Sequence, residues 1–313
     1  MAADRDERDS PISIRVPDDA AGERLDRFLA AMLGSRTRAQ SLISASRVRV
    51  DGRARPKRHA VRAGEVIEVD DPPEEPAAEE SDSRGRIEIA YQDDDLLVVD
   101  KPAGMVVHPG RGNRTGTLAQ ALRGMAMGGE DPWRAGIVHR LDRDTSGLLV
   151  VARSEDVHRA LRALLAARQL HREYLTLVEG RLEARSGTID APIGRDRRDR
   201  LLVSIDTDVP REARTHFRLE RPLPATSLLR AQLETGRTHQ IRVHMASIGH
   251  PVVGDRQYGG RETYGLTRQF LHATRLRFPH PVTGEEVDVE SPLPEDLKAA
   301  LAKAEGEVGR RSS

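Results

Sequence analysis

A stretch rich in proline, glutamate and serine divides this 313-residue chain into two parts of different character. It has no hydrophobic periodicity, and residues 70–82 hold seven acidic side chains and no basic one. Such segments are solvated linkers rather than packed elements. The sequence therefore predicts a small domain and a large domain joined by an acidic, proline-rich linker. The predicted bounds are a disordered tail at 1–10, the small domain at 11–70, the linker at 71–86, the large domain at 87–304 and a second tail at 305–313.

The small domain is predicted to contain two short helices and a hairpin. Apolar residues recur at helical spacing over 24–33, and a second helix is predicted at 37–44. The pair Asp51-Gly52 is a strong hairpin turn signal because both residues tolerate the left-handed backbone that such turns need. Strands are predicted at 12–16, 48–50 and 65–69.

Basic side chains are concentrated in this small domain. Residues 24–62 hold eleven Lys and Arg side chains against two acidic ones, although the whole chain has 50 of each charge and a formal net charge of zero. A basic block of this density is typical of nucleic-acid-binding domains. We expect its exposed cations to contact nucleic-acid phosphates, namely Arg36, Arg38, Arg47, Arg49, Arg53, Lys57 and Arg58.

The composition excludes several classes of chemistry. The chain has no cysteine, which rules out disulfides, thiolate catalysis and cysteine-based zinc sites. His239 and His244 are five residues apart rather than at the four-residue spacing of a helical metal pair, so no metal site is predicted. The first residues hold no apolar signal region, and no apolar run approaches a membrane span of about 18 residues. We expect a cytoplasmic protein without a bound cofactor.

The large domain is predicted to be of the α+β class. Strand-like segments dominate it and do not alternate regularly with helices, so a doubly wound parallel sheet is not favoured. Strands are predicted at 87–91, 96–100, 147–152, 174–179, 214–220, 227–233 and 286–289, and helices at 117–123, 156–167 and 239–248.

Residues 136–152, GIVHRLDRDTSGLLVVA, place a crowded set of charges at the start of an apolar strand. A carboxylate at Asp142 can be held there between arginines and presented by a rigid element, as a catalytic group requires. The alternative is a surface turn with a solvated ion pair. The neighbouring Arg143 and Asp144 are interpreted as solvated or framework charges.

Three motifs, taken in order, resemble those of the RluA-type pseudouridine synthases: HRLD at 139–142, REYLTLVEG at 172–180 and ETGRTHQIRVHMASIGHPVVGDRQYG at 234–259. The resemblance covers roughly residues 87–290. The small domain resembles the alpha-L (S-four type) RNA-binding domain that often precedes this catalytic domain. The resemblance implies a pseudouridine synthase fold with a mixed, largely antiparallel sheet. It also implies an isomerase that acts on RNA uridines without redox cofactor or metal.

The resemblance also implies roles for three residues. Asp142 corresponds to the family's essential aspartate, which must be ionised to act as nucleophile or base. Arg242 would supply the guanidinium that favours that ionised form, and Tyr174 would stack near the target base. Three first steps remain open: Asp142 attacks the base, attacks the sugar or removes a sugar proton. Without the resemblance, Tyr174 is interpreted as a core residue and Arg242 as a surface cation paired with Asp255 or Glu234.

A uracil inside folded RNA must be turned out of its stack before it can react. By resemblance, the guanidinium of Arg140 would occupy the vacated space, since its planar group stacks well. Backbone amides and arginines of the loop at 110–116 would contact phosphate, and the arginines at 195–211 would form a second RNA surface. Further RNA contacts are predicted for His139, Arg237, His239 and Gln240.

The favoured substrate is large-subunit ribosomal RNA or its precursor, bound by a monomer. Transfer RNA is the first alternative, because sister branches of the family share these motifs. A non-catalytic RNA-binding ribosome-assembly factor is the second. A glycosidase-like hydrolase is disfavoured because it needs two carboxylates around the bond, and Asp255 is interpreted as a turn residue bonded to its own backbone.

Overall fold

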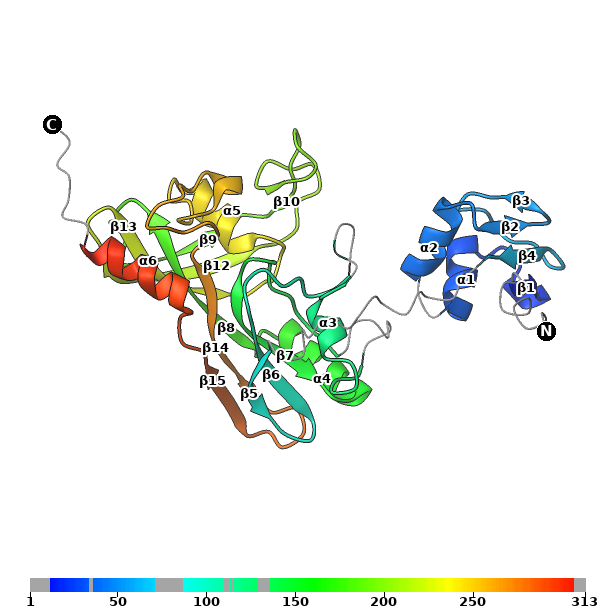
Figure 1. Ribbon diagram of the computed structural model, residues 1–313, viewed down its shortest axis with the longest axis horizontal. Coiled ribbons are helices and arrows are strands. Elements are labelled where there is room, and N and C mark those ends of the chain that lie inside the picture. Colours follow the sequence, from blue (N-terminus) through cyan, green and yellow to red (C-terminus); the bar gives the residue numbers. More distant parts are fainter. Residues whose placement is uncertain are drawn as a thin grey trace, which may run out of the picture. The chain divides into compact units, whose positions relative to one another are not determined.

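The computed structural model describes residues 12–33, 36–70, 87–109, 113, 115–128 and 136–306, without the side chains of 36–38 and 41. The chain divides into two compact units, residues 1–81 and 82–313 (Figure 1). The predicted tail at 1–10 and the predicted linker at 71–86 lie outside the described residues, so their bounds stay predictions.

The smaller unit is a four-stranded antiparallel sheet with two helices. The turn between β2 and β3 is the predicted one, with φ of 47° at Asp51 and 73° at Gly52. Leu25 and Leu29 of α1 pack with Val48 and Ile67 of the sheet. The elements are β1 Ile12–Arg15, η1 Asp18–Ala20, α1 Leu25–Leu33, α2 Arg36–Ser44, β2 Val48–Val50, β3 Arg53–Ala54 and β4 Val66–Val69, with strand order β1-β4-β2-β3.

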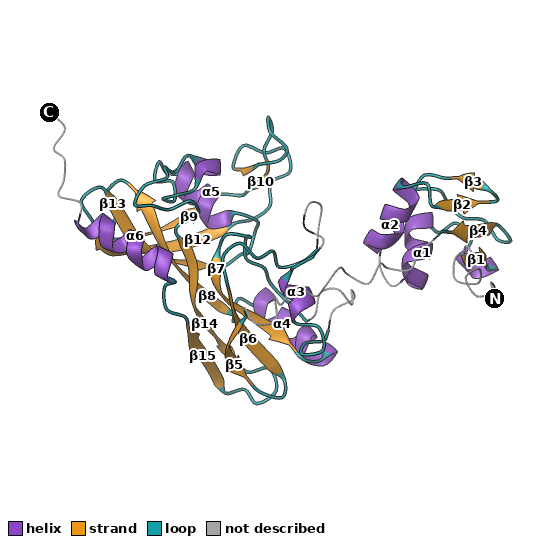
Figure 2. Ribbon diagram, viewed as in Figure 1, coloured by secondary structure: helices purple, strands orange, loops and turns teal. Residues whose placement is uncertain are grey.

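The larger unit is built on one large sheet, which Figure 2 shows in orange. Its order is β5-β6-β7-β14-β8-β13-β12-β9, and β15 pairs with β14. Only the short β7–β14 pairing is parallel among its described ladders, which confirms the predicted fold class. The strands are β5 Glu88–Gln92, β6 Leu96–Lys101, β7 Ser146–Ala152, β8 His171–Glu179, β9 Ser186–Asp190, β12 Arg214–Pro222, β13 Thr226–Leu233, β14 Leu271–Pro279 and β15 Glu286–Glu290.

Helices cover both faces of this sheet. Side chains of α3, α5 and α6 join one core cluster, whereas α4 joins a second. None of the described helices is both long enough and apolar enough to cross a membrane. The helical elements are α3 Leu118–Ala121, α4 Glu155–Ala166, α5 Gln240–Ser247, η4 Arg256–Tyr258 and α6 Glu295–Gly306, and a separate hairpin pairs β10 Gly194–Arg195 with β11 Val203–Ser204.

Strands β6 and β7 lie between the two cores. Leu97 and Val99 of β6 face the first cluster, whereas Leu96 and Val98 face the second. The residues of β7 alternate in the same way, and all seven are buried. A strand buried on both faces reads as a continuous apolar run, which explains the sequence at 148–152. The turn that carries Asp142 therefore leads into one of the most enclosed strands of the sheet.

The structure corrects the predicted end of the large domain. Residues 305 and 306, which were assigned to the tail, are the last turn of α6. Leu297, Ala300 and Ala304 lie on one face of this helix and are fully buried, at the spacing of an amphipathic helix. Residues 307–313 lie outside the described part of the chain.

Candidate active site

Asp142 lies in the turn before β7, and a buried lysine fixes that turn. The backbone N–H of Thr145 donates to the Asp142 carbonyl at 3.2 Å. Lys101, which is fully buried at the end of β6, donates to the carbonyl oxygens of Pro102, Met105 and Arg143 at 2.8, 3.0 and 3.0 Å. Burial lowers the pKa of Lys101 to about 7. These bonds anchor the Asp142 turn to the end of the neighbouring strand, a role that sequence reasoning did not assign.

Arg242 of α5 lies between two carboxylates. Its Nε and Nη2 atoms contact Asp255 Oδ2 and Oδ1 at 2.6 and 2.8 Å, and its Nη1 contacts Asp142 Oδ2 at 3.3 Å. Gln257 accepts a further hydrogen bond from Nη2 at 2.8 Å. Burial lowers the pKa of Arg242, but its bonds to Asp255 and the charge of Asp142 outweigh that effect and raise the pKa.

The exposed fractions of these side chains show that Arg242 and Asp255 are buried, whereas Asp142 is partly accessible. Arg242 and Asp255 are 7% and 1% exposed, whereas Asp142 is 15% exposed. Asp255 is thus structural as predicted, but it acts by holding Arg242 rather than by bonding its own backbone. The structure also places Arg242 inside the protein, which excludes the alternative of a surface cation.

Tyr174 is buried in β8 and its charge environment includes Asp142. Burial raises the pKa of the Tyr174 hydroxyl; the charge of Arg172 opposes that effect and the charge of Asp142 reinforces it. Arg172 lies two residues earlier, on the same face of the strand. It is also buried, and its Nε has no hydrogen-bond partner among the described residues. The three residues implied by the resemblance thus come together, and the tyrosine is kept in its neutral form.

Two further side chains complete the surroundings of Asp142. His239, which directly precedes α5, places Nε2 at 3.9 Å from Asp142 Oδ1 and Nδ1 at 2.8 Å from the hydroxyl of Tyr258. The guanidinium carbon of Arg242 lies 4.9 Å from the centre of the Tyr258 ring, a cation–π distance. His239 was predicted as an RNA contact, and Tyr258 was not singled out.

Two other predicted RNA contacts of the large domain, Arg140 and His139, differ in whether their side chains face solvent. Arg140 is exposed. His139 turns inward: its Nε2 accepts the Val150 N–H at 3.3 Å, and its Nδ1 is buried without a partner among the described residues. Burial, reinforced by the charge of Arg172, lowers the pKa of His139 to about 3. Both ring nitrogens of this neutral imidazole therefore face protein.

Gln240 and Arg237 are also engaged within the protein. The Gln240 amide nitrogen donates to the Arg214 carbonyl and the Thr215 hydroxyl, and its oxygen accepts from Thr235 and the Arg237 backbone. The Arg237 Nε donates to the Glu212 carbonyl at 3.0 Å. These bonds organise the start of α5, while the predicted RNA contacts of both residues stay predictions.

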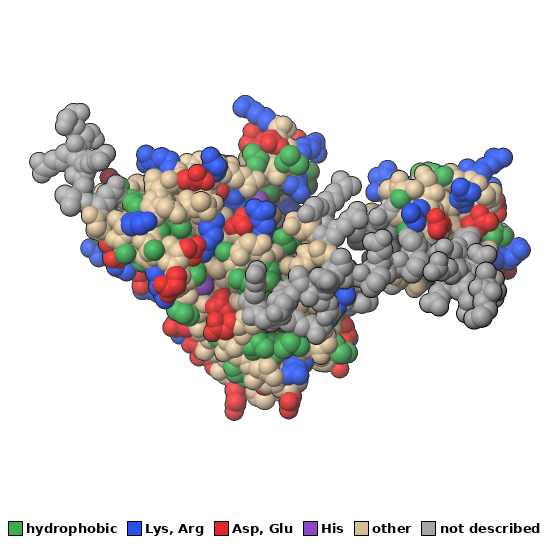
Figure 3. Space-filling model, viewed as in Figure 1, with side chains coloured by type: hydrophobic (Ala, Val, Ile, Leu, Met, Phe, Trp, Pro, Cys, Tyr) green, Lys and Arg blue, Asp and Glu red, His purple; other side chains and the backbone are tan. Residues whose placement is uncertain are grey.

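Most of the predicted basic surface of the small domain is accessible. Arg49, Arg53, Lys57 and Arg58 are exposed, and Arg47 is 43% exposed with Asp70 at 3.6 Å. Figure 3 shows Lys and Arg side chains on the surface of this unit. The side chains of Arg36 and Arg38 lie outside the described residues, as does most of the predicted phosphate-binding loop at 110–116.

The segment at 195–211 is less basic than its arginines indicate. It holds five arginines and four aspartates. Arg197 pairs with Asp206 at 3.3 Å and with Asp208 at 2.9 Å. Arg198 and Arg200 are exposed. The aspartates offset most of this positive charge, and the RNA surface stays a prediction.

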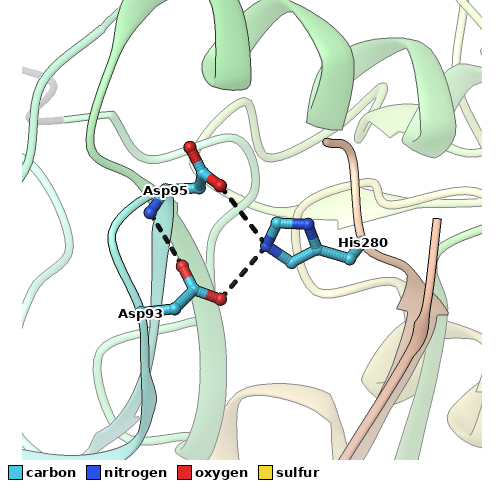
Figure 4. A group of neighbouring side chains, drawn as sticks. All are labelled: Asp93, Asp95 and His280. Atoms are coloured by element: carbon cyan, nitrogen blue, oxygen red, sulfur yellow. Dashed lines mark hydrogen bonds and ion pairs between the residues drawn. The ribbon is translucent and has the colours of Figure 1, made fainter. Parts of the chain in front are cut away.

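One cluster among the described residues has the composition of a metal site. His280 Nε2 lies 3.1 Å from Asp93 Oδ2 and 4.0 Å from Asp95 Oδ2, and both carboxylates approach the ring (Figure 4). However, His280 Nδ1 accepts the N–H groups of Val282 and Thr283. The neutral ring then carries its hydrogen on Nε2 and has no lone pair there for a metal. This cluster joins β5 to the turn after β14.

Comparisons with known proteins agree with this geometry. Residues 95–247 match the family model described as RNA pseudouridylate synthase, and residues 23–67 match the S4 domain model. The chain is 43% identical to "Ribosomal large subunit pseudouridine synthase D" of Xanthomonas campestris pv. campestris over 92% of this chain and 90% of that protein. It is 44% identical to the protein of the same name from Nitrosomonas europaea over 96% and 90%.

A solved structure shares the fold of the larger unit. The chain resembles "Human RNA Pseudouridylate Synthase Domain Containing 1" with a TM-score of 0.54 and 31% identity, over 66% of this chain and 84% of the human one. The two bacterial relatives are matched over 90% of their length. Asp142, Tyr174 and Arg242 all lie within residues 95–247, which match the family model. The chain therefore belongs to the RNA pseudouridylate synthase family.

Proposed function

We propose that this enzyme converts specific uridines of large-subunit ribosomal RNA to pseudouridine, with Asp142 as the group that acts on the nucleotide. The names of the two bacterial relatives support the substrate. One observation carries the role of Asp142: its carboxylate is partly exposed and contacts Arg242, which is itself held in place by a buried aspartate. A carboxylate supported in this way keeps a defined orientation.

The reaction breaks the bond from the sugar to uracil N1, turns the uracil and joins its C5 to the same sugar carbon. C5 then loses its proton and N1, now free of the sugar, gains one, so the isomerisation balances without oxidant or reductant. Asp142 provides the nucleophile or base, and Arg242 holds one of its oxygens. Tyr174, buried and neutral, presents a ring against which a uracil can lie. Attack on the base, attack on the sugar and removal of a sugar proton each need the same ionised carboxylate.

Base flipping is part of this proposal. Asp142 lies in a turn at the end of a buried strand, so a uridine inside a helix must leave its stack to reach the carboxylate. Arg140 is two residues away and exposed, which suits a guanidinium that fills the space of the extruded base. The exposed cations of the small domain would hold structured RNA through its backbone, with an affinity that falls as salt rises. We further propose that the enzyme works as a monomer in the cytoplasm.

The test is to incubate the protein with unmodified large-subunit ribosomal RNA and map pseudouridine along it. Wild type should form pseudouridine at defined positions, and Asp142→Asn should form none while still binding the RNA. Asp144→Asn is the matched control, because Asp144 lies two residues away and pairs with Arg143 at the surface. Full activity in Asp142→Asn would refute the role of Asp142. If the protein modified transfer RNA but not ribosomal RNA, the substrate would be transfer RNA, which is the first alternative.

A further inference from the structure

A chain of hydrogen-bonding groups runs from the β10–β11 hairpin to Asp142. The backbone N–H of Val203 in β11 donates to the Tyr258 hydroxyl oxygen at 3.3 Å, and that oxygen lies 2.8 Å from His239 Nδ1. On the other side of the imidazole, Nε2 lies 3.9 Å from Asp142 Oδ1. Three segments that are distant in sequence thus meet through Tyr258 and His239.

The hydrogen positions in this chain follow from its donors and acceptors. Since the Tyr258 oxygen accepts the hydrogen of Val203, the hydroxyl's own hydrogen needs an acceptor. The only acceptor that the described contacts provide is His239 Nδ1. A ring nitrogen that accepts a hydrogen bond carries no hydrogen, so the hydrogen of the neutral imidazole lies on Nε2. Burial lowers the pKa of His239, which favours this neutral form.

The surroundings of Nε2 select the same tautomer. An ionised carboxylate only accepts hydrogen bonds, so Asp142 Oδ1 favours an N–H on Nε2. At 3.9 Å the two atoms are too far apart for a hydrogen bond, but catalytic contacts are often long before substrate binds and shorten in the complex. His239 also has a left-handed backbone with φ of 57°. Such strain in a residue other than glycine persists where the surrounding structure enforces it.

We propose that His239 is a positioning residue for Asp142: Tyr258 holds the imidazole as the Nε2–H tautomer, and the imidazole directs that hydrogen to one carboxylate oxygen while Arg242 holds the other. His239 and Arg242 lie three residues apart, where helical geometry places side chains on one face. Two donors on two oxygens restrict rotation of the carboxylate, which a single contact does not. This inference rests on the proposed role of Asp142.

The first test needs no RNA. Two-bond nitrogen–proton correlation spectra of the full-length protein, labelled in its eleven histidines, report the tautomer of each imidazole. The signals of His239 are those missing from His239→Gln. We expect an unprotonated Nδ1 and a protonated Nε2, and we expect Tyr258→Phe to move the Nδ1 resonance. A protonated Nδ1 in the wild type, or no response to Tyr258→Phe, would overturn the proposal.

The second test measures turnover of unmodified ribosomal RNA. Tyr258→Phe keeps the ring beside Arg242 but removes the hydroxyl, and we expect kcat to fall about tenfold with KM within twofold. His239→Ala should lose more, and His239→Gln should recover part of that loss because its amide N–H replaces Nε2–H. In the His239→Gln background Tyr258→Phe should change kcat less than twofold.

Tyr91→Phe is the matched control for the loss of a tyrosine hydrogen bond, here the 2.7 Å bond to Asp93. It should leave kcat unchanged. Wild-type turnover in His239→Ala, or equal losses in His239→Ala and His239→Gln, would refute the positioning role. If Tyr258→Phe or His239→Ala does not fold, the tautomer of the wild type, assigned with His239→Gln, still decides. Full activity in Asp142→Asn would instead refute the proposed function, whatever the tautomer of His239.

Discussion

Arg242 and Asp255 form a buried two-point pair in which Nε and Nη2 face the two carboxylate oxygens at 2.6 and 2.8 Å. Because this pair uses one edge of the planar guanidinium, the remaining nitrogen, Nη1, is directed at Asp142. Two-point contacts of this kind fix the direction of an arginine as well as its place. The position of the charge that supports Asp142 is therefore set by Asp255, which is itself buried.

Replacing Arg242 should impair catalysis far more than RNA binding. We expect Arg242→Met to lower single-turnover rates on ribosomal RNA about 100-fold or more, with RNA affinity within about threefold of wild type. The physical reason is that Asp142 loses the arginine that contacts its carboxylate at 3.3 Å, whereas Arg242 is too buried to contact phosphate. Rates and filter-binding affinities measured at one salt concentration provide the comparison. Equal losses in rate and affinity would place Arg242 among the phosphate-binding residues.

Neutralising Asp255 should affect both stability and turnover. Asp255→Asn removes the closer and more buried of the two carboxylates that pair with Arg242, so we expect the free energy of unfolding to fall by about 3 kcal/mol. Turnover should also fall, because Nη1 is no longer directed at Asp142. Urea denaturation and single-turnover rates measure the two effects. Asp144→Asn, at a partly exposed pair with Arg143, should change stability by less than about 1 kcal/mol.

Much of the candidate site followed from the motifs, but its supporting contacts did not. Asp142 and Arg242 are 100 residues apart, and the motif resemblance implied that they meet. Asp255 was named as a partner of Arg242 only in the alternative of a surface cation, and the burial of the pair depends on the turn before η4. Lys101 was not singled out from the sequence, and only the converging carbonyl groups show that it anchors a turn. His139 was predicted as an RNA contact, whereas both of its ring nitrogens face the protein.

In the fold, too, local sequence patterns were predictable and the pairing of distant strands was not. Strands with clear alternation or continuous apolar runs were predicted close to their observed bounds. Strand β14 was missed because His272, Arg275 and Arg277 interrupt its apolar pattern, although it pairs with β7, β8 and β15. Its arginines pair across strands with acidic residues, as Arg275 does with Asp288 and Glu173. The order of strands in the sheet rests on such contacts between distant segments.

The buried His139 should make the enzyme lose stability in mild acid. Its pKa is about 3 in the folded protein against an ordinary value of 6.5, so above pH 6.5 the imidazole is neutral in both states and its contribution is fully present. As the pH falls toward 3, the unfolded chain binds a proton that the folded protein does not. The free energy of unfolding should then fall by about 1.4 kcal/mol for each pH unit, as an upper limit.

Comparing wild type with His139→Gln isolates this effect, because glutamine does not titrate. We expect the difference in their free energies of unfolding to be constant from pH 7.5 to 8.5. Between pH 6.5 and 4 it should change by roughly 2 kcal/mol in favour of the variant. Denaturation curves at each pH provide the measurement, and a difference that is independent of pH would show that His139 is not held neutral.

Gly147 in β7 should not tolerate a side chain. A Cβ at this position would lie 2.3 Å from the carbonyl oxygen of Ala273 in β14, and the residue has φ of 113°. Gly147→Ala should therefore separate the parallel pair β7–β14 and lower the free energy of unfolding by more than about 2 kcal/mol. Gly249→Ala is the matched control, with φ of 81° and nothing within 4 Å of its Cβ, and should cost about 1 kcal/mol from backbone strain alone. Because β7 supports the Asp142 turn, turnover should fall in Gly147→Ala and not in Gly249→Ala. Equal stability and equal turnover in the two variants would show that β7 and β14 can move apart without disturbing the site.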